Sequence, residues 1–127
     1  MADQIDDIFS SAVPTLYILS DSRGETAYAV VCAAAAQFSA DSVDIVRVTN
    51  IKDVDTVGEY FDEKFVPGSA CAVFHTFADG TLRREIRREL DRRGIPSIDL
   101  LGPAVTVIST LTGEAPSREI GAIYRKK

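Results

Sequence analysis

Short apolar runs alternate with segments of helical periodicity along most of the chain, and this alternation is the strongest constraint on its fold. Strands are expected at residues 16–19, 43–48, 70–74 and 97–101. Helices are expected at residues 24–38, 53–65, 81–93 and 102–111. Strands that alternate with helices form right-handed βαβ units and a parallel sheet. The sequence therefore predicts an α/β fold: a three-layer αβα, Rossmann-like domain with a doubly wound parallel sheet of four strands in the order 2-1-3-4.

Length and charge restrict the class of protein. The 127 residues, 46% of them hydrophobic, suit one domain over 1–127 with a single core. The net charge of −5 argues against nucleic acid and membrane surfaces as partners, because both attract an excess of positive charge. Asp3, Asp6 and Asp7 stand where a secretory signal would need basic residues, and no apolar run approaches the ~18 residues of a membrane span. A cytoplasmic location is expected.

The pattern within each element predicts its place in the domain. The uninterrupted apolar run 70–74 belongs in the middle of the sheet, whereas the charges in 43–48 favour an edge strand. The first helix is expected to pack on the sheet through Ala27, Val30, Val31, Ala34 and Phe38. The alanine run 33–36 suits either core packing or a subunit contact, so a homodimer stays open. Residues 114–127 are expected to lead out of the domain.

The loop after the first strand is the main candidate for a binding site. In an open α/β sheet the ligand crevice lies beyond the carboxyl ends of the strands, here between the loops after strands 1 and 3. Gly24, nearby hydroxyls and the N-terminus of the next helix suit a phosphate or a nucleotide's phosphates. The alternative is that Asp21 or Ser22 only caps that helix. The candidate binding residues are Ser20, Asp21, Ser22, Gly24, Glu25, Thr26, His75 and Thr76.

The remaining reactive side chains restrict the chemistry, and no catalytic residue is assigned. His75 is the single histidine, suited either to contact phosphate and relay a proton or to a structural hydrogen bond. No second histidine and no cysteine pair accompanies it, so a transition-metal site is not expected. The segment 20–22 resembles the nucleophile segment of serine esterases, but the late Asp-x-x-His pair of those enzymes is missing from this chain. Cys32 and Cys71 are expected to be reduced core thiols. None of the lysines follows a glycine, so the chain has no lysine-containing phosphate loop.

The segment 81–93 carries six arginines against three acidic residues, a local charge of +3, while the rest of the chain carries −8. Such asymmetry suits a docking surface for an acidic partner, with Arg84, Arg87 and Arg88 as candidates. The alternative is a solvated helix face with internal ion pairs such as Glu89 to Arg93.

Two motifs in this order carry a family resemblance. They are Ser-Asp-Ser-x-Gly-Glu-Thr-Ala at 20–27 and Gly-Ile-Pro followed by Leu-Gly-Pro within 94–103. Together with the segments 74–76, 82–86 and 111–116, they resemble the N-terminal half of the regulatory proteins of pyruvate, phosphate dikinase and phosphoenolpyruvate synthetase. The resemblance covers nearly the whole chain.

The resemblance implies a bifunctional regulator. Members of that family act as an ADP-dependent kinase on a threonine of the dikinase or synthetase, and as a phosphate-dependent phosphorylase that removes the group and releases pyrophosphate. ADP and phosphate are then the substrates, and no cofactor is expected in this chain. The family's phosphate loop lies in a second domain, which would begin near residue 127. The alternative function is a non-catalytic module that binds a phosphate, a nucleotide or a partner protein.

Overall fold

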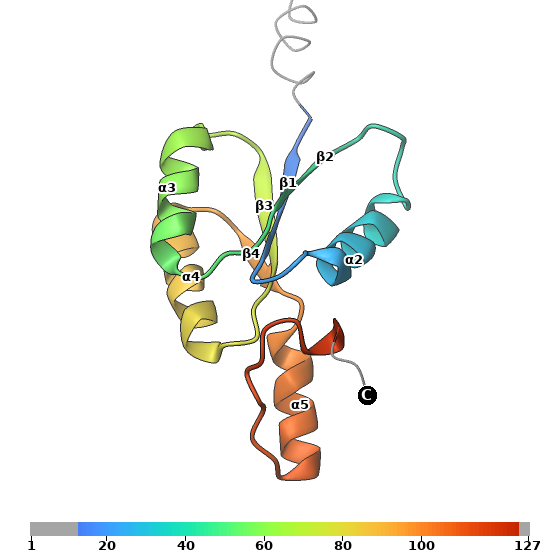
Figure 1. The fold of residues 1–127 in the computed structure, drawn as a ribbon. Coiled ribbons are helices and arrows are strands. Elements are labelled where there is room, and N and C mark those ends of the chain that lie inside the picture. The colour runs from blue at the N-terminus through green and yellow to red at the C-terminus, as the bar shows by residue number, and fades with distance from the viewer. Residues whose placement is uncertain (1–12, 125–127) are drawn as a thin grey trace, which may run out of the picture.

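The computed structural model describes residues 13–124, which form one parallel sheet with helices on both faces (Figure 1). The strands are β1 (Thr15–Ser20), β2 (Asp44–Val48), β3 (Cys71–Thr76) and β4 (Ser97–Asp99). Their order is β2-β1-β3-β4 and every pairing is parallel, so the predicted fold class and strand order are confirmed. As expected, β3 is internal and β2 lies at an edge.

The helices follow the predicted positions within a few residues. They are α2 (Glu25–Ala35), α3 (Val54–Lys64), α4 (Gly80–Arg92) and α5 (Gly102–Thr112), with a short 3-10 helix η1 (Ala122–Tyr124). Asp53 caps α3 by accepting a hydrogen bond from the Thr56 N–H at 2.9 Å, and Asp79 caps α4 through the Thr81 N–H at 3.0 Å. None of the helices among the described residues has the length and apolar character needed to span a membrane.

The larger hydrophobic core lies between the sheet and the pair α3 and α4. Apolar residues at helical spacing, among them Val57 and Phe61 on α3 and Ile86 and Leu90 on α4, are buried against Val73 of β3. The full cluster is Leu19, Ile51, Val57, Phe61, Val73, Phe77, Leu82, Ile86, Leu90 and Ile95. This face of the sheet therefore carries the larger of the two buried clusters, which holds α3 and α4 against the strands.

The core under α2 is smaller. Only Ile18, Ala27 and Val31 form its buried cluster. The expected five-residue packing face is therefore wrong in part, because Val30, Ala34 and Phe38 are exposed. Ala27 and Val31 are four residues apart and share one narrow stripe, and α2 ends at Ala35, so Phe38 lies beyond the helix.

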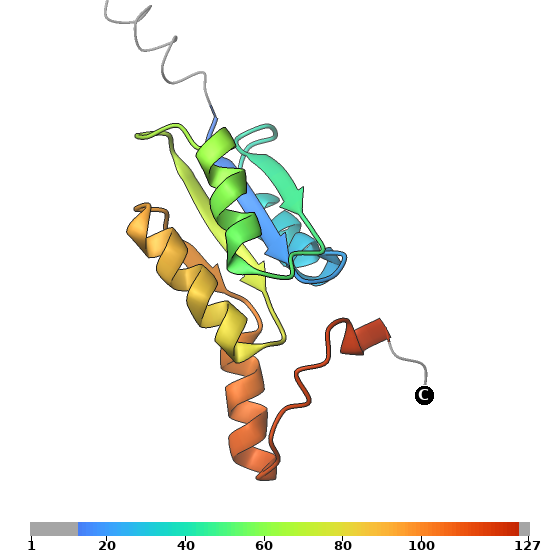
Figure 2. The same cartoon turned by 60° about the vertical axis from the view of Figure 1, so that its left-hand side comes forward.

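The helix α5 does not fold back onto the sheet. It extends past the carboxyl ends of the strands, and the residues after it turn back toward the sheet and end in η1 (Figure 2). The described part of the segment 114–127 therefore does not lead out of the domain as expected. Gly113 makes this reversal with φ 74°, and its N–H donates to the Ser109 carbonyl at 2.9 Å. The returning segment forms one wall of the candidate site.

Candidate functional site

The loop after β1 is held in one conformation by hydrogen bonds to its neighbours. The Ser22 N–H donates to Ser20 Oγ at 3.0 Å, and the Ile51 N–H donates to the Ser20 carbonyl at 3.0 Å. The Asn50 N–H donates to the Ser22 carbonyl at 3.0 Å. The loop is therefore tied to the end of β2 and presents the start of α2 at the carboxyl edge of the sheet.

The N-terminus of α2 has no side-chain cap. Gly24 occupies the N-cap position with φ 76°, a left-handed conformation that favours glycine. Neither Asp21 nor Ser22 caps the helix, so the capping alternative is wrong. The helix dipole favours negative charge at this end of α2.

Asp21 connects the two loops that border the crevice. Its Oδ2 accepts a hydrogen bond at 2.8 Å from the N–H of Ala78, in the loop between β3 and α4. The side chain is buried, and burial raises the pKa of Asp21, while this hydrogen bond opposes the rise. The expected meeting of the loops after strands 1 and 3 is therefore present, with an interior carboxyl group at their junction.

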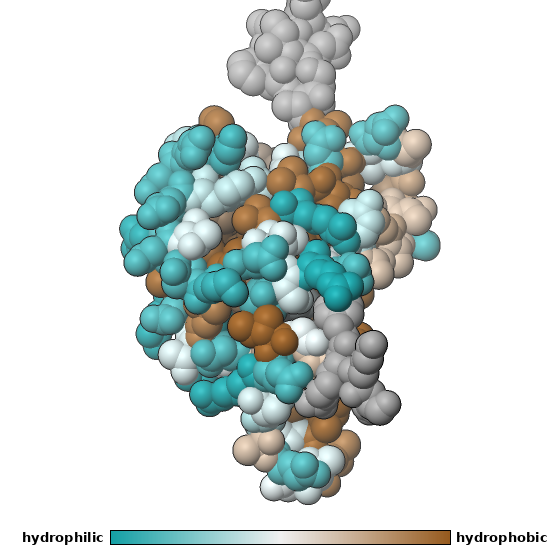
Figure 3. All heavy atoms as spheres, in the orientation of Figure 1, coloured by the Kyte–Doolittle hydropathy of each residue, from teal (hydrophilic) through white to brown (hydrophobic). Residues whose placement is uncertain are grey.

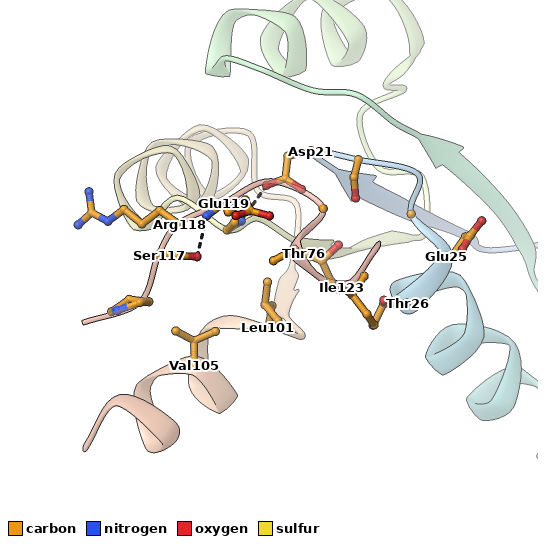
Figure 4. Close-up of a pocket in the computed structure, with 16 residues that line it drawn as sticks. Asp21, Glu25, Thr26, Thr76, Leu101, Val105, Ser117, Arg118, Glu119 and Ile123 are labelled. Carbon is orange, nitrogen blue, oxygen red and sulfur yellow. Dashed lines mark hydrogen bonds between the residues drawn. The ribbon is translucent and has the colours of Figure 1, made fainter. Parts of the chain in front are cut away.

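A cavity of about 270 Å³ opens beside Asp21. Figure 4 shows Thr26 and Thr76 on one side of it and Leu101 and Val105 of the α5 region on another. Its walls come from four parts of the chain: Asp21, Ser22, Gly24, Glu25, Thr26, Thr76, Ala78, Leu101, Val105, Pro116, Ser117, Arg118, Glu119, Gly121, Ala122 and Ile123. The sequence did not point to the α5 and 116–123 walls, because no local pattern shows that a segment returns to the sheet.

The charges around the cavity are mixed. Asp21, Glu25 and Glu119 bring carboxylates to the wall, whereas Arg118 is the only cation among the lining residues that the structure describes, and it lies 3.7 Å from Asp79. Most of the remaining lining is apolar. An anion at this site would depend on backbone N–H groups of α2 more than on side-chain charge. The geometry suits a ligand with an apolar body and a few polar groups.

His75 does not join the crevice. Successive side chains of a strand point to opposite faces, so Thr76 lines the cavity while His75 packs into the α3 and α4 side with Phe77, at 5.8 Å between ring centroids. His75 is fully buried, and neither ring nitrogen has a hydrogen-bond partner. Burial lowers the pKa of His75; Arg83 and Arg87 add to this effect and Asp99 opposes it.

The arginines of α4 fall into two groups. Arg83 pairs with Asp99 at 3.1 Å, and Glu89 accepts from both Arg92 and Arg93 at 2.6 Å. Arg93 also lies 2.8 Å from Asp62 of α3. The expected Glu89 to Arg93 pair is present, so part of this surface is an internal ion-pair network.

The docking candidates form the other group. Arg84, Arg87 and Arg88 are exposed and have no ion-pair partner in the described part of the chain. No group of three or more His, Cys, Asp or Glu within residues 13–124 is arranged to hold a metal ion.

A parallel α/β domain with this strand order, and with a cavity at the carboxyl edge of its sheet, belongs to the class of doubly wound α/β folds. Comparison with known proteins makes the class specific: the model of the kinase/pyrophosphorylase family matches residues 16–127. The chain belongs to this family, and the resemblance seen in the sequence is confirmed.

Similar proteins carry the provisional name pyruvate, phosphate dikinase regulatory protein. One from Halalkalibacterium halodurans is 33% identical over 112 residues, which cover 88% of this chain and 41% of the relative. One from Bdellovibrio bacteriovorus is 36% identical over 109 residues, covering 86% and 38%. The chain therefore spans about two fifths of the length of these relatives.

Proposed function

We propose that this chain supplies one domain of a cytoplasmic regulatory enzyme that modifies a threonine of pyruvate, phosphate dikinase or phosphoenolpyruvate synthetase. In one direction ADP gives its terminal phosphoryl group to the threonine hydroxyl and leaves as AMP. In the other direction an oxygen of inorganic phosphate attacks the phosphorus of the phosphothreonine, the threonine oxygen leaves and takes up a proton, and the pyrophosphate formed is released. The observation that carries the proposal is the family match over residues 16–127.

The crevice is proposed to bind phosphate or the phosphates of ADP. The N-terminus of α2 supports this role, since Gly24, Glu25 and Thr26 line the cavity together with the hydroxyl-bearing residues Ser22 and Thr76. Ser20 acts indirectly, because its Oγ accepts the Ser22 N–H and shapes the loop. His75 has no direct role in this proposal, because its side chain is buried on the face of β3 opposite to the one that carries Thr76.

Activity is expected to require more than this chain. Phosphoryl transfer depends on positioned cations around the phosphates, and no lysine of the chain follows a glycine as in a phosphate loop. We therefore expect the 127-residue chain alone to transfer no phosphoryl group from ADP to a purified dikinase. The part of the relatives that this chain does not match is proposed to supply the nucleotide loop.

A chimeric enzyme tests the function directly. The matching segment of the Halalkalibacterium relative is replaced by residues 16–127 of this chain, and the intact relative is the positive control. Mass spectrometry should show ADP-dependent phosphorylation of a dikinase threonine, and adding phosphate should remove the group and release pyrophosphate. A folded chimera that is inactive while the intact relative is active would overturn the proposal.

Calorimetry on the chain alone tests the crevice. Thr26→Val removes a hydroxyl at the second residue of α2, and Thr81→Val makes the same change at the second residue of α4, outside the cavity. We expect weak binding of ADP or phosphate by the parent, a loss of about threefold to tenfold in affinity with Thr26→Val, and no change with Thr81→Val. Equal changes in affinity with the two variants would show that the crevice does not bind ADP or phosphate.

A non-catalytic binding module is the second candidate. It is favoured by one observation: the cavity is formed entirely within this chain, which spans only about two fifths of its relatives. A chain that binds ADP, phosphate or the dikinase, combined with an inactive chimera, would support this reading.

A further inference from the structure

Arg83 differs from the exposed arginines of α4. The outer surface of α3 and α4 is mostly hydrophilic, teal in Figure 3. The Arg83 side chain is instead only 19% exposed, and its Nε lies 3.1 Å from Oδ2 of Asp99. Its Nη1 donates to the Phe77 carbonyl at 3.0 Å, in the loop whose Ala78 N–H holds Asp21 at 2.8 Å. Arg83 therefore joins α4 both to the end of β4 and to the loop that borders the crevice.

Asp99 continues these contacts to the start of α5. Leu101 is the N-cap residue of α5 and has no polar side chain to cap it. Asp99 takes this role, because its Oδ1 accepts hydrogen bonds from the N–H of Leu101 at 3.0 Å and from the N–H of Gly102 at 2.7 Å. Its other oxygen, Oδ2, faces Arg83. One carboxylate thus ties the start of α5 to α4 through charge-assisted hydrogen bonds.

The packing around this carboxylate leaves no room for a side chain at Gly102. A Cβ there would overlap Oδ2 of Asp99 and lie 2.9 Å from Nε of Arg83. Gly102 belongs to the Leu-Gly-Pro motif and Arg83 to the segment 82–86, so two segments of the family resemblance meet at Asp99. Since α5 makes no substantial contact with any other described helix or strand, its direction depends on this first turn.

The first turn of α5 also forms the apolar wall of the crevice. Leu101 and Val105 line the cavity, and Thr26 and Thr76 lie on another side of it (Figure 4). A site with an apolar wall and a few hydroxyl groups suits a ligand that has both an apolar body and a polar end. One water needs about 15 Å³ of such space, so the cavity of about 270 Å³ exceeds what an inorganic phosphate occupies.

We propose that Arg83 and Asp99 are positioning residues, which hold Leu101 and Val105 where this wall receives the nucleoside of ADP. The phosphates of ADP then lie at the start of α2, so the inference rests on the proposed binding of ADP by the crevice. Arg83 and Asp99 act through the wall and do not touch the ligand. The pair thereby sets the preference for ADP over pyrophosphate, which has two phosphates and no nucleoside.

Titrations of the 127-residue chain with ADP and with pyrophosphate, followed by NMR, test the assignment. Arg83→Gln removes the charge beside Asp99. Arg93→Gln is its matched control, because Arg93 is on the same helix, is 16% exposed and pairs with Glu89 at 2.6 Å, outside the crevice. We expect Arg83→Gln to weaken ADP binding about tenfold and pyrophosphate binding less than about twofold, and Arg93→Gln to change neither. Arg83→Lys, which keeps the charge, should restore part of the ADP affinity.

Amide exchange tests the positioning without any ligand. We expect the amides of Leu101 and Gly102 to exchange at least about threefold faster in Arg83→Gln than in the parent. The amide of Thr56, which Asp53 caps on α3, is the internal reference and should not change. Circular dichroism checks that the variants are folded.

The two measurements separate the possible failures. Unchanged exchange at Leu101 and Gly102 would show that Arg83 does not position α5. An unchanged affinity for ADP, or an equal loss for ADP and pyrophosphate, would contradict the nucleoside wall. A parent chain that binds neither compound would overturn the nucleoside assignment together with the proposed crevice function, and faster exchange in Arg83→Gln would then leave only its structural half.

Discussion

The two sides of the sheet differ in how completely they are packed. α3 and α4 cover one side with a buried cluster of ten residues and carry charge on their outer surface. On the other side, α2 buries a cluster of three, and α5 extends beyond the sheet with its apolar residues exposed. The first side is complete within the chain, because its helices bury apolar residues and expose polar ones. The second side satisfies this rule only if another surface covers it.

The largest expected difference between the two sides is in stability. Leu90→Ala removes a fully buried side chain from α4, and Leu111→Ala makes the same change on α5 at a site that is 80% exposed. We expect Leu90→Ala to lower the free energy of unfolding by about 2–5 kcal/mol, and Leu111→Ala to change it by no more than about 0.5 kcal/mol. Urea unfolding of dilute, monomeric protein measures both. Similar losses would mean that α5 is packed within the single chain.

A smaller effect is expected from the pH dependence of stability. Because burial lowers the pKa of His75, the unfolded chain takes up a proton before the folded chain does as the pH falls below about 6.5. The free energy of unfolding should therefore fall with decreasing pH in this window, by at most about 1.4 kcal/mol per pH unit. Urea titrations between about pH 7.5 and 5 measure the slope, and His75→Leu should flatten it.

The crevice side should respond with the opposite sign. The raised pKa of Asp21 means that the folded chain holds a proton to higher pH than the unfolded chain, so its contribution to stability falls as the pH rises above the ordinary pKa of an aspartate, 3.8. Asp21→Asn removes this contribution and isolates that of His75. An unchanged acid slope in His75→Leu would show that another group accounts for it.

The smallest effect on stability is expected at the outer surface of α4. Replacing Arg84, Arg87 and Arg88 by glutamate should change the melting temperature very little, since these exposed residues have no ion-pair partner in the described chain. If this surface docks an acidic patch of the target enzyme, association should slow and depend less on salt. Stopped-flow binding at two salt concentrations measures this. Glu85→Arg is the control, because it adds positive charge to the same helix and should change association in the opposite direction. A triple variant that binds like the parent would show that these arginines form only a solvated face.

Sequence patterns predicted the elements and their order because these depend on local information. Alternating apolar runs and helical periodicity set the strands and helices, and the handedness of βαβ units leaves few arrangements of a parallel sheet. The same reasoning placed the loop of Ser20 to Thr26 at the carboxyl edge, near Thr76. Strand alternation, applied to His75 and Thr76, already indicates that only one of the two can face the crevice.

Tertiary structure alone decided what completes the site and what leaves one side open. The return of residues 116–123 to the cavity and the division of the α4 arginines into paired and unpaired groups depend on contacts between residues far apart in the chain. The direction of α5 after β4 is also a tertiary property: its sequence predicts a helix, but its lack of charge does not say which surface it covers. Local propensity fixes the shape of each element, whereas its neighbours are selected by the free energy of burying the whole surface.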